Sequence, residues 1–152
     1  MNVNSLTSKM EINNIKFKKI TISDVDFLYT LLEERSDIVN ISHKKMPTFL
    51  QHKKFVKLNP YSYWYIVFHK NTKIGTLYLT NLNEIGLHIK NEFKNLKIEK
   101  MILTKLFHKH PRSRYLVNIN PKNEIATKIF KKSGFKLLQH TYELFIENRT
   151  GK

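Results

Sequence analysis

One stretch, residues 84–106, constrains the fold more than any other part of the chain. It reads EIGLHIKNEFKNLKIEKMILTKL. Its first six residues alternate apolar and polar side chains, which is typical of a β-strand with one buried face. Apolar residues then recur at helical spacing: Ile98, Met101, Ile102 and Leu106. The stretch therefore predicts a strand, a polar loop over 90–96 and a helix.

The loop of this unit is a candidate anion site. Where a strand ends as a helix begins, several backbone N–H groups lack partners and point outward, and they attract phosphates and other anions. Lys90, Lys94, Lys97 and Lys100 add positive charge there. A lysine-rich loop is also often no more than a solvated surface, so both interpretations stay open.

Length and composition predict one domain in the cytoplasm. A chain of 152 residues with 41% hydrophobic residues suffices for a single core. We expect the domain over 14–146, with a flexible segment at 1–13 and a tail at 147–152. No apolar run reaches membrane-spanning length, no signal peptide is evident, and cysteine is absent, which removes thiolate metal sites and thiol nucleophiles. No metal site is predicted.

The formal net charge of +15 suits nucleic acid, an anionic membrane or a phosphorylated small molecule. The chain has 23 Lys but only 4 Arg, whereas base and phosphate recognition favours Arg. No nucleic-acid-binding motif is present either. The composition therefore disfavours nucleic-acid binding, and steep salt dependence of binding would reveal it.

The other segments complete a mixed sheet with helices on both faces. We expect a strand at 15–20, helices at 21–35 and from Pro47 to Asn59, and a hairpin of 62–68 with 73–80. A short strand at 114–119, a helix ending at Gly134, and strands at 135–138 and 140–146 follow. The order β-α-α-β-β-β-α-β-α-β-β predicts an α/β (mixed α+β) fold. Its twisted, mostly antiparallel sheet has about six to seven strands, and a right-handed crossover makes 84–89 and 114–119 parallel.

This pattern resembles the GCN5-related N-acetyltransferase (GNAT) superfamily over residues 15–144. The most specific match is the motif N..A...(Y/F)...GF, carried by Asn123, Ala126, Phe130, Gly134 and Phe135. Residues 47–68 and 73–86 are similar, more diffusely, to acetyltransferases that act on nucleotide-linked amino sugars. The resemblance implies acetyl-CoA as co-substrate and direct transfer, in a ternary complex, to a primary amine of a small molecule. A monomer or homodimer is expected.

The resemblance also implies a cofactor site where strands 84–89 and 114–119 splay apart. The pantetheine arm would pair with the backbone of the first strand, and the pyrophosphate would rest on the N–H groups of 94–100. A backbone amide near Leu87 or His88 would stabilise the oxyanion. The implied cofactor-binding residues are Leu87, His88, Ile89, Lys94, Asn95, Leu96, Lys97, Ile98, Glu99, Lys100, Asn118, Asn123 and Phe130.

The cofactor loop departs from the family pattern (Q/R)xxGxG. Lys94 takes the first place, and Lys97 and Glu99 replace the two glycines, which normally let the backbone approach the phosphates. Glu99 would either repel a phosphate or act as an ordinary first-turn acid of the helix. A non-catalytic protein with the same fold is therefore the main alternative to an enzyme.

Glu84 and His88, on the polar face of one strand, are the candidate general bases, with a solvated acid and a packed histidine as the alternatives. Phe130 stands where many members carry a proton-donating Tyr, so Tyr142 or water would take that role. The candidate acceptor-binding residues are His43, His52, Tyr63 and Tyr65. Their alternatives are exposed histidines and aromatic packing within the sheet.

Overall fold

The computed structural model describes residues 12–36, 45–144 and 146, and it contains one mixed sheet. The strands are β1 (Ile15–Lys19), β2 (Tyr63–His69), β3 (Thr72–Leu79), β4 (Glu84–Ile89) and β5 (Leu116–Val117). They lie in the order β1-β2-β3-β4-β5. The first four pair antiparallel and β4 pairs parallel with β5, which confirms the predicted crossover.

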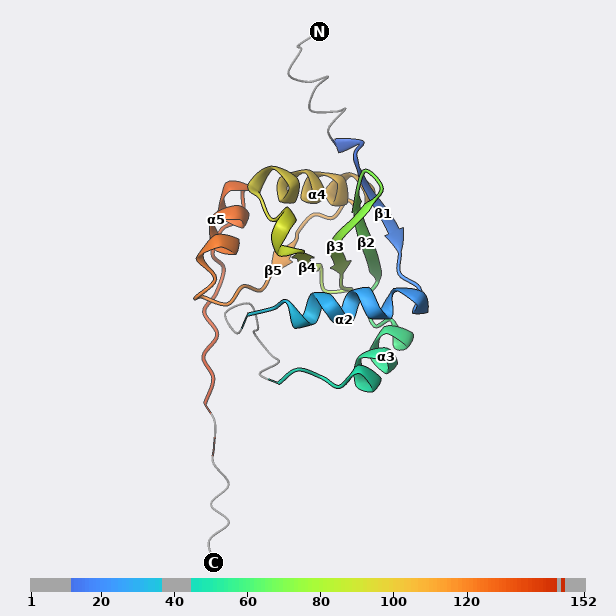
Figure 1. The fold of residues 1–152 in the computed structure, drawn as a ribbon. Helices are drawn as coiled ribbons and strands as arrows, with labels where there is room; N and C mark the ends of the chain where they lie inside the picture. Colours follow the sequence, from blue (N-terminus) through green and yellow to red (C-terminus); the bar gives the residue numbers. More distant parts are fainter. Residues whose placement is uncertain (1–11, 37–44, 145, 147–152) are drawn as a thin grey trace, which may run out of the picture.

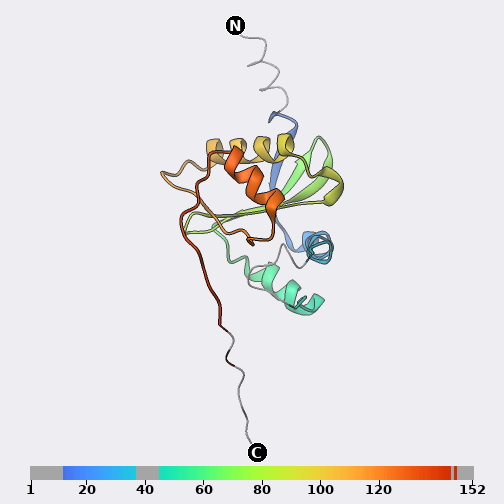
Figure 2. The same cartoon turned by 90° about the vertical axis from the view of Figure 1, so that its left-hand side faces the viewer.

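The helices cover both faces of the sheet, as predicted (Figures 1 and 2). The short 3-10 turn η1 (Ile22–Asp24) leads into α2 (Val25–Glu33), which lies with α3 (Phe49–Leu58) on one face. The opposite face carries α4 (Leu96–Lys109) and α5 (Glu124–Lys132), and η2 (Asn91–Phe93) connects β4 to α4.

Local capping interactions mark the ends of these helices. Side-chain hydrogen bonds cap two helix starts, and backbone conformation ends α3. At the start of α3, the Thr48 hydroxyl accepts from the Gln51 N–H at 3.2 Å, and the Gln51 side chain accepts from the Thr48 N–H at 2.8 Å. The helix ends at Asn59, whose φ of 44° no helix can continue. At the start of α4, the Asn95 side chain accepts from the Ile98 N–H at 2.9 Å.

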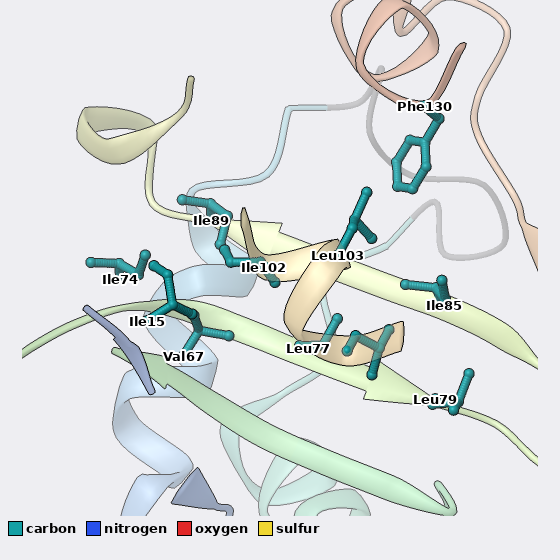
Figure 3. Packing of buried hydrophobic residues seen from close by; sticks show 11 residues of the cluster. Ile15, Val67, Ile74, Leu77, Leu79, Ile85, Ile89, Ile102, Leu103 and Phe130 are labelled. Carbon is teal, nitrogen blue, oxygen red and sulfur yellow. The ribbon is translucent and has the colours of Figure 1, made fainter. Parts of the chain in front are cut away.

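Each face of the sheet has its own hydrophobic core. The larger core lies under α4 and α5, where Leu77, Ile102 and Leu106 are fully buried (Figure 3). The smaller core lies under α2 and α3 and contains Val25, Leu28, Val56, Trp64 and Ile66. The two cores explain the period-2 pattern of the central strands, because alternate side chains enter opposite cores.

The two strands predicted at the end of the chain are absent from the residues that the structure describes. Residues 135–138 and the described part of 140–146 follow no regular structure, and Leu137 and Tyr142 are 72% and 90% exposed. Alternating residues make a strand only where another strand supplies hydrogen bonds, and none of the described strands pairs with this segment. The sheet therefore has five strands in place of the predicted six to seven, and β5 is shorter than the predicted 114–119.

Candidate cofactor and acceptor site

Strands β4 and β5 pair only at their beginnings. Glu84 lies opposite Leu116 and Ile85 opposite Val117, after which β5 ends while β4 continues to Ile89. The last residues of β4 are therefore unpaired on the β5 side, as the resemblance implies.

Strand register decides which backbone groups face this open side. The Thr80 N–H donates to the Glu84 carbonyl at 3.0 Å and the Lys90 N–H donates to the Ile74 carbonyl at 2.8 Å, so even-numbered residues of β4 bond to β3. By alternation, the N–H and C=O groups of Leu87 and Ile89 point to the β5 side. His88, opposite Thr76, directs its backbone to β3, so only two of the three predicted residues present backbone groups to the opening.

Glu84 and Asn118 meet where the strands diverge. The Asn118 Nδ2 donates to Glu84 Oε1 at 3.1 Å, and the Thr80 hydroxyl donates to Glu84 Oε2 at 3.4 Å. These contacts hold the Glu84 carboxylate beside the opening. The structure thus brings together two site residues that lie far apart in the sequence.

His88 is buried on the α2 side of the sheet, with 5% of its surface exposed. Its ring forms a hydrogen bond with the backbone of Leu31, while Nε2 has no hydrogen-bond partner among the described residues. Burial, and then the charges of Arg35 and Lys94, lower the His88 pKa to about 3. The ring is therefore neutral near pH 7 and a weak general base, although Nε2 can accept a hydrogen bond.

An aromatic and cationic wall lies on the same side of the sheet as His88, and sequence reasoning did not name its Tyr78 and Arg35. The Tyr61 and Tyr78 rings are stacked with their centroids 3.9 Å apart, and the Arg35 charge acts on both hydroxyls. Gly86 makes room for this stack, because a Cβ there would lie 1.9 Å from Tyr78 Cζ. A glycine inside an alternating strand was the one available signal, since it often marks a close approach.

The three predicted acceptor-binding residues that the structure describes, His52, Tyr63 and Tyr65, do not form one site. His52 is buried between α2 and α3, 5.4 Å from the Tyr29 ring, and its pKa is lowered by burial. Tyr63 and Tyr65 lie on the α4 side, where Tyr63 stacks on His110 at 3.6 Å and the Tyr65 hydroxyl lies 2.8 Å from His110 Nε2. His43 lies outside the described residues.

The loop that lacks the family's glycines needs none for its backbone. Helix α4 begins at Leu96 directly after the Asn95 cap, which is extended, with φ of −156°. Positive φ among the described non-glycine residues occurs only at Asn59, Lys70 and Asn83. Lys97 and Glu99 are ordinary residues of the first turns of α4, so their side chains cause no backbone strain.

Glu99, in contrast, is not an ordinary exposed acid of a first helical turn. Only 9% of its surface is exposed, and Oε2 has no hydrogen-bond partner among the described residues. Burial raises its pKa to about 7, against a smaller opposing effect of Lys94. Glu99 lines a hollow of about 190 Å³ between α4 and α5. The hollow is lined by Lys94, Asn95, Leu96, Glu99, Ile125, Lys128, Ile129 and Lys132.

The late sequence motif has a structural explanation. The Asn123 side chain caps α5 by accepting from the Ala126 N–H at 3.1 Å. Gly134 ends the helix with φ of 93°, and the Phe135 N–H donates to the Phe130 carbonyl at 3.0 Å. The Phe130 and Phe135 rings meet edge to face at 5.2 Å. Asn123 and Phe130 therefore hold α5 in place.

Two absences hold for the described part of the chain. No group of three or more His, Asp or Glu side chains there could hold a metal ion. Within the same residues, no helix has the length and hydropathy that crossing a membrane requires.

The arrangement of the sheet and the opening between β4 and β5 define the GNAT fold, and solved structures with this fold match most of the chain. The spermidine/spermine N-acetyltransferase SpeG from Vibrio cholerae, as mutant forms, has a TM-score of 0.68 and 16% identity, covering 90% of this chain and 88% of its own. RimL, a ribosomal L7/L12 alpha-N-protein acetyltransferase in complex with coenzyme A, has a TM-score of 0.65 and 15% identity, covering 83% and 82%.

The N-acetyltransferase PseH from Campylobacter jejuni has a TM-score of 0.62 and 18% identity, covering 84% of this chain and 92% of its own. No protein-family model and no curated protein matches the chain. These likenesses confirm the predicted fold, and at such low identity they define the fold alone.

Proposed function

We propose that the protein is an acetyl-CoA-dependent N-acetyltransferase acting on a primary amine of a small molecule in the cytoplasm. The observation that carries this proposal is the opening beyond Ile85 and Val117, where β4 continues without a partner strand. Leu87 and Ile89 present backbone hydrogen-bonding groups there, which an extended pantetheine arm can pair with as a strand would. The solved structures with the same fold support the same class of reaction.

Acetyl-CoA supplies an acetyl group activated as a thioester, and the chain supplies positioning and proton transfer. The Leu87 N–H stabilises negative charge that develops on the thioester oxygen. Glu84, held by Asn118 and Thr80, accepts the proton of the acceptor ammonium through a water molecule, so that the neutral amine can attack. His88 is excluded as a strong base by its pKa of about 3.

The departing thiolate receives its proton from water in this scheme. Phe130 has no proton to give and packs against Phe135. Tyr142 is 90% exposed, on the segment after α5 that packs against no strand. A thiolate is a good leaving group, so the reaction does not depend on a positioned acid.

The acceptor carries a negative charge in this proposal, as a nucleotide-linked amino sugar does. Arg35 lies on the α2 side with His88, and Lys94 is close enough to affect the pKa values of both His88 and Glu99. The net charge of the whole protein, +15, disfavours polycationic acceptors such as the spermidine and spermine named for SpeG. A non-catalytic binding protein is the second candidate, favoured by the buried acid Glu99 at the expected phosphate site.

Calorimetric titration with acetyl-CoA, with free CoA and ATP as controls, tests the proposal. Micromolar binding that prefers acetyl-CoA over ATP, followed by acetylation of nucleotide-linked amino sugars in an acceptor screen, is the expected result. Binding without turnover of any amine would favour the non-catalytic alternative. Absence of binding at millimolar acetyl-CoA would refute the proposal that the protein is an acetyltransferase.

A further inference from the structure

The hollow between α4 and α5 combines an anion-attracting helix start with a buried acid. Lys94 lines it from the loop before α4, and Lys128 and Lys132 line it from α5. Glu99 is the only acidic side chain among the described residues that line it. Its Oε2 atom is buried and has no hydrogen-bond partner in the described part of the chain, whereas buried polar atoms in proteins are nearly always hydrogen-bonded.

The protonation state of Glu99 decides how this hollow treats a phosphate. An ionised carboxylate can only accept hydrogen bonds and would repel phosphate oxygens at contact distance. A protonated carboxyl group donates one short hydrogen bond to the same oxygens. The three lysines attract the phosphate in either case, so the carboxyl proton is the variable component of the site.

The charged side chains that share the hollow with Glu99 come from two elements. Lys94 lines it from the loop before α4, and Lys128 and Lys132 line it from α5. Lys94 favours the ionised form of Glu99, but burial outweighs this effect, and the free protein therefore titrates at Glu99 near pH 7. Only modest stabilisation by a ligand is then needed to keep the proton in place.

We propose that Glu99 binds a phosphate group of CoA as a neutral carboxylic acid, so that cofactor binding takes up one proton from solution. This inference rests on the proposed function, since it places CoA at the start of α4. Glu99, which replaces a glycine of the GNAT pattern, would then have a role in binding CoA. The bond formed is a hydrogen bond from the Glu99 carboxyl proton to a phosphate oxygen, and no covalent bond changes.

Calorimetry with free CoA, in two buffers of different ionisation enthalpy, measures the proton count directly. At about pH 8, the wild-type protein should take up nearly one proton per CoA, and its Kd should rise about tenfold per pH unit above about pH 7. Glu99→Gln keeps the shape and a donor but cannot titrate, so its Kd should vary little with pH and its proton uptake should be near zero.

Glu92→Gln is the matched control, because Glu92 is exposed and forms an ion pair with Lys90 at 3.1 Å outside the hollow. It should retain the wild-type proton uptake. Ionisation of the CoA phosphates affects all three proteins equally and cancels in the comparison.

Two outcomes separate this inference from the proposed function. CoA binding with no proton uptake by the wild type at about pH 8 overturns the inference and leaves the acetyltransferase proposal intact. That measurement needs no variant, so it holds even if Glu99→Gln does not fold. No CoA binding at any pH overturns both.

Discussion

Replacing Glu99 with Gln should change how the stability of the protein depends on pH. Only 9% of the surface of Glu99 is exposed, and its pKa rises from 4.5 to about 7 in the folded protein. The folded state therefore holds a proton that the unfolded chain loses between about pH 4.5 and about pH 7. Over this window, the contribution of Glu99 to the wild-type free energy of unfolding falls as pH rises.

The size of the effect follows from the pKa difference. A rise of about 2.5 units from the 4.5 of the unfolded chain, at 1.36 kcal/mol per unit, gives about 3 kcal/mol, lost by about pH 7 and constant above it. Glu99→Gln carries no titrating group at this position, so its free energy of unfolding does not undergo this loss. Relative to the wild type, the variant should gain about 3 kcal/mol between about pH 4 and about pH 8.

Urea unfolding of both proteins at several pH values, followed by circular dichroism, measures the difference. Other titrating groups contribute equally to both proteins and cancel. Glu92→Gln, at a side chain that is 63% exposed, should follow the wild-type curve within about 0.5 kcal/mol. Parallel pH curves for the wild type and Glu99→Gln would refute the burial argument, because a solvated Glu99 would titrate equally in both states.

Three further predictions concern the core, the aromatic wall and the base. Leu103→Ala should lower the free energy of unfolding by about 2–5 kcal/mol in a denaturant titration, because Leu103 is 1% exposed. Leu137→Ala, at a position 72% exposed, should change it by less than about 0.5 kcal/mol, and equal costs would contradict the buried core. Gly86→Ala should cost about 1–3 kcal/mol by displacing the Tyr78 ring, and a crystal structure with Tyr78 unmoved would disprove this reasoning. Since the His88 pKa is about 3, His88→Gln should leave the shape of the kcat/KM profile between about pH 6 and about pH 9 unchanged, and loss of an inflection near pH 6.5 would count against a neutral His88.

The sequence predicted the central strands and helices well because local signals and tertiary packing agree there. The strand 84–89 and the helix after it have strong periodicity, and Thr48, Asn59 and Asn95 supply the caps that fix helix ends. At 135–138 and 140–146, the same alternating pattern predicted strands without a partner. Periodicity describes which side chains share a face, whereas a strand also needs a neighbour at its edge.

The neighbours of the candidate site could be predicted where they depend on chain order but not where they depend on tertiary contact. Glu84 and Asn118 were named from the sequence for separate roles, which stay predictions, and the parallel pairing of their strands brings the two side chains together. Arg35 was missed because nothing in its local sequence distinguishes it from other residues at a helix end. The aromatic pattern of β2 was ambiguous for the same reason: Tyr63 and Tyr65 alternate correctly, but only the position of α4 decides that they pack against His110.

The proposed cofactor loop differs from the GNAT pattern in charge rather than in backbone shape. Because the described residues from Lys94 to Lys100 include none with positive φ, Lys97→Gly would relieve no strain and would weaken the helix by about 1 kcal/mol. Glu99→Gly, at the same cost to the helix, would also remove the buried carboxyl group from the proposed phosphate site. If the loop had merely decayed, the two substitutions together should restore CoA binding. If Glu99 binds the phosphate as an acid, Glu99→Gln should retain CoA binding at high pH, and the glycine pair should bind CoA less tightly than Glu99→Gln does.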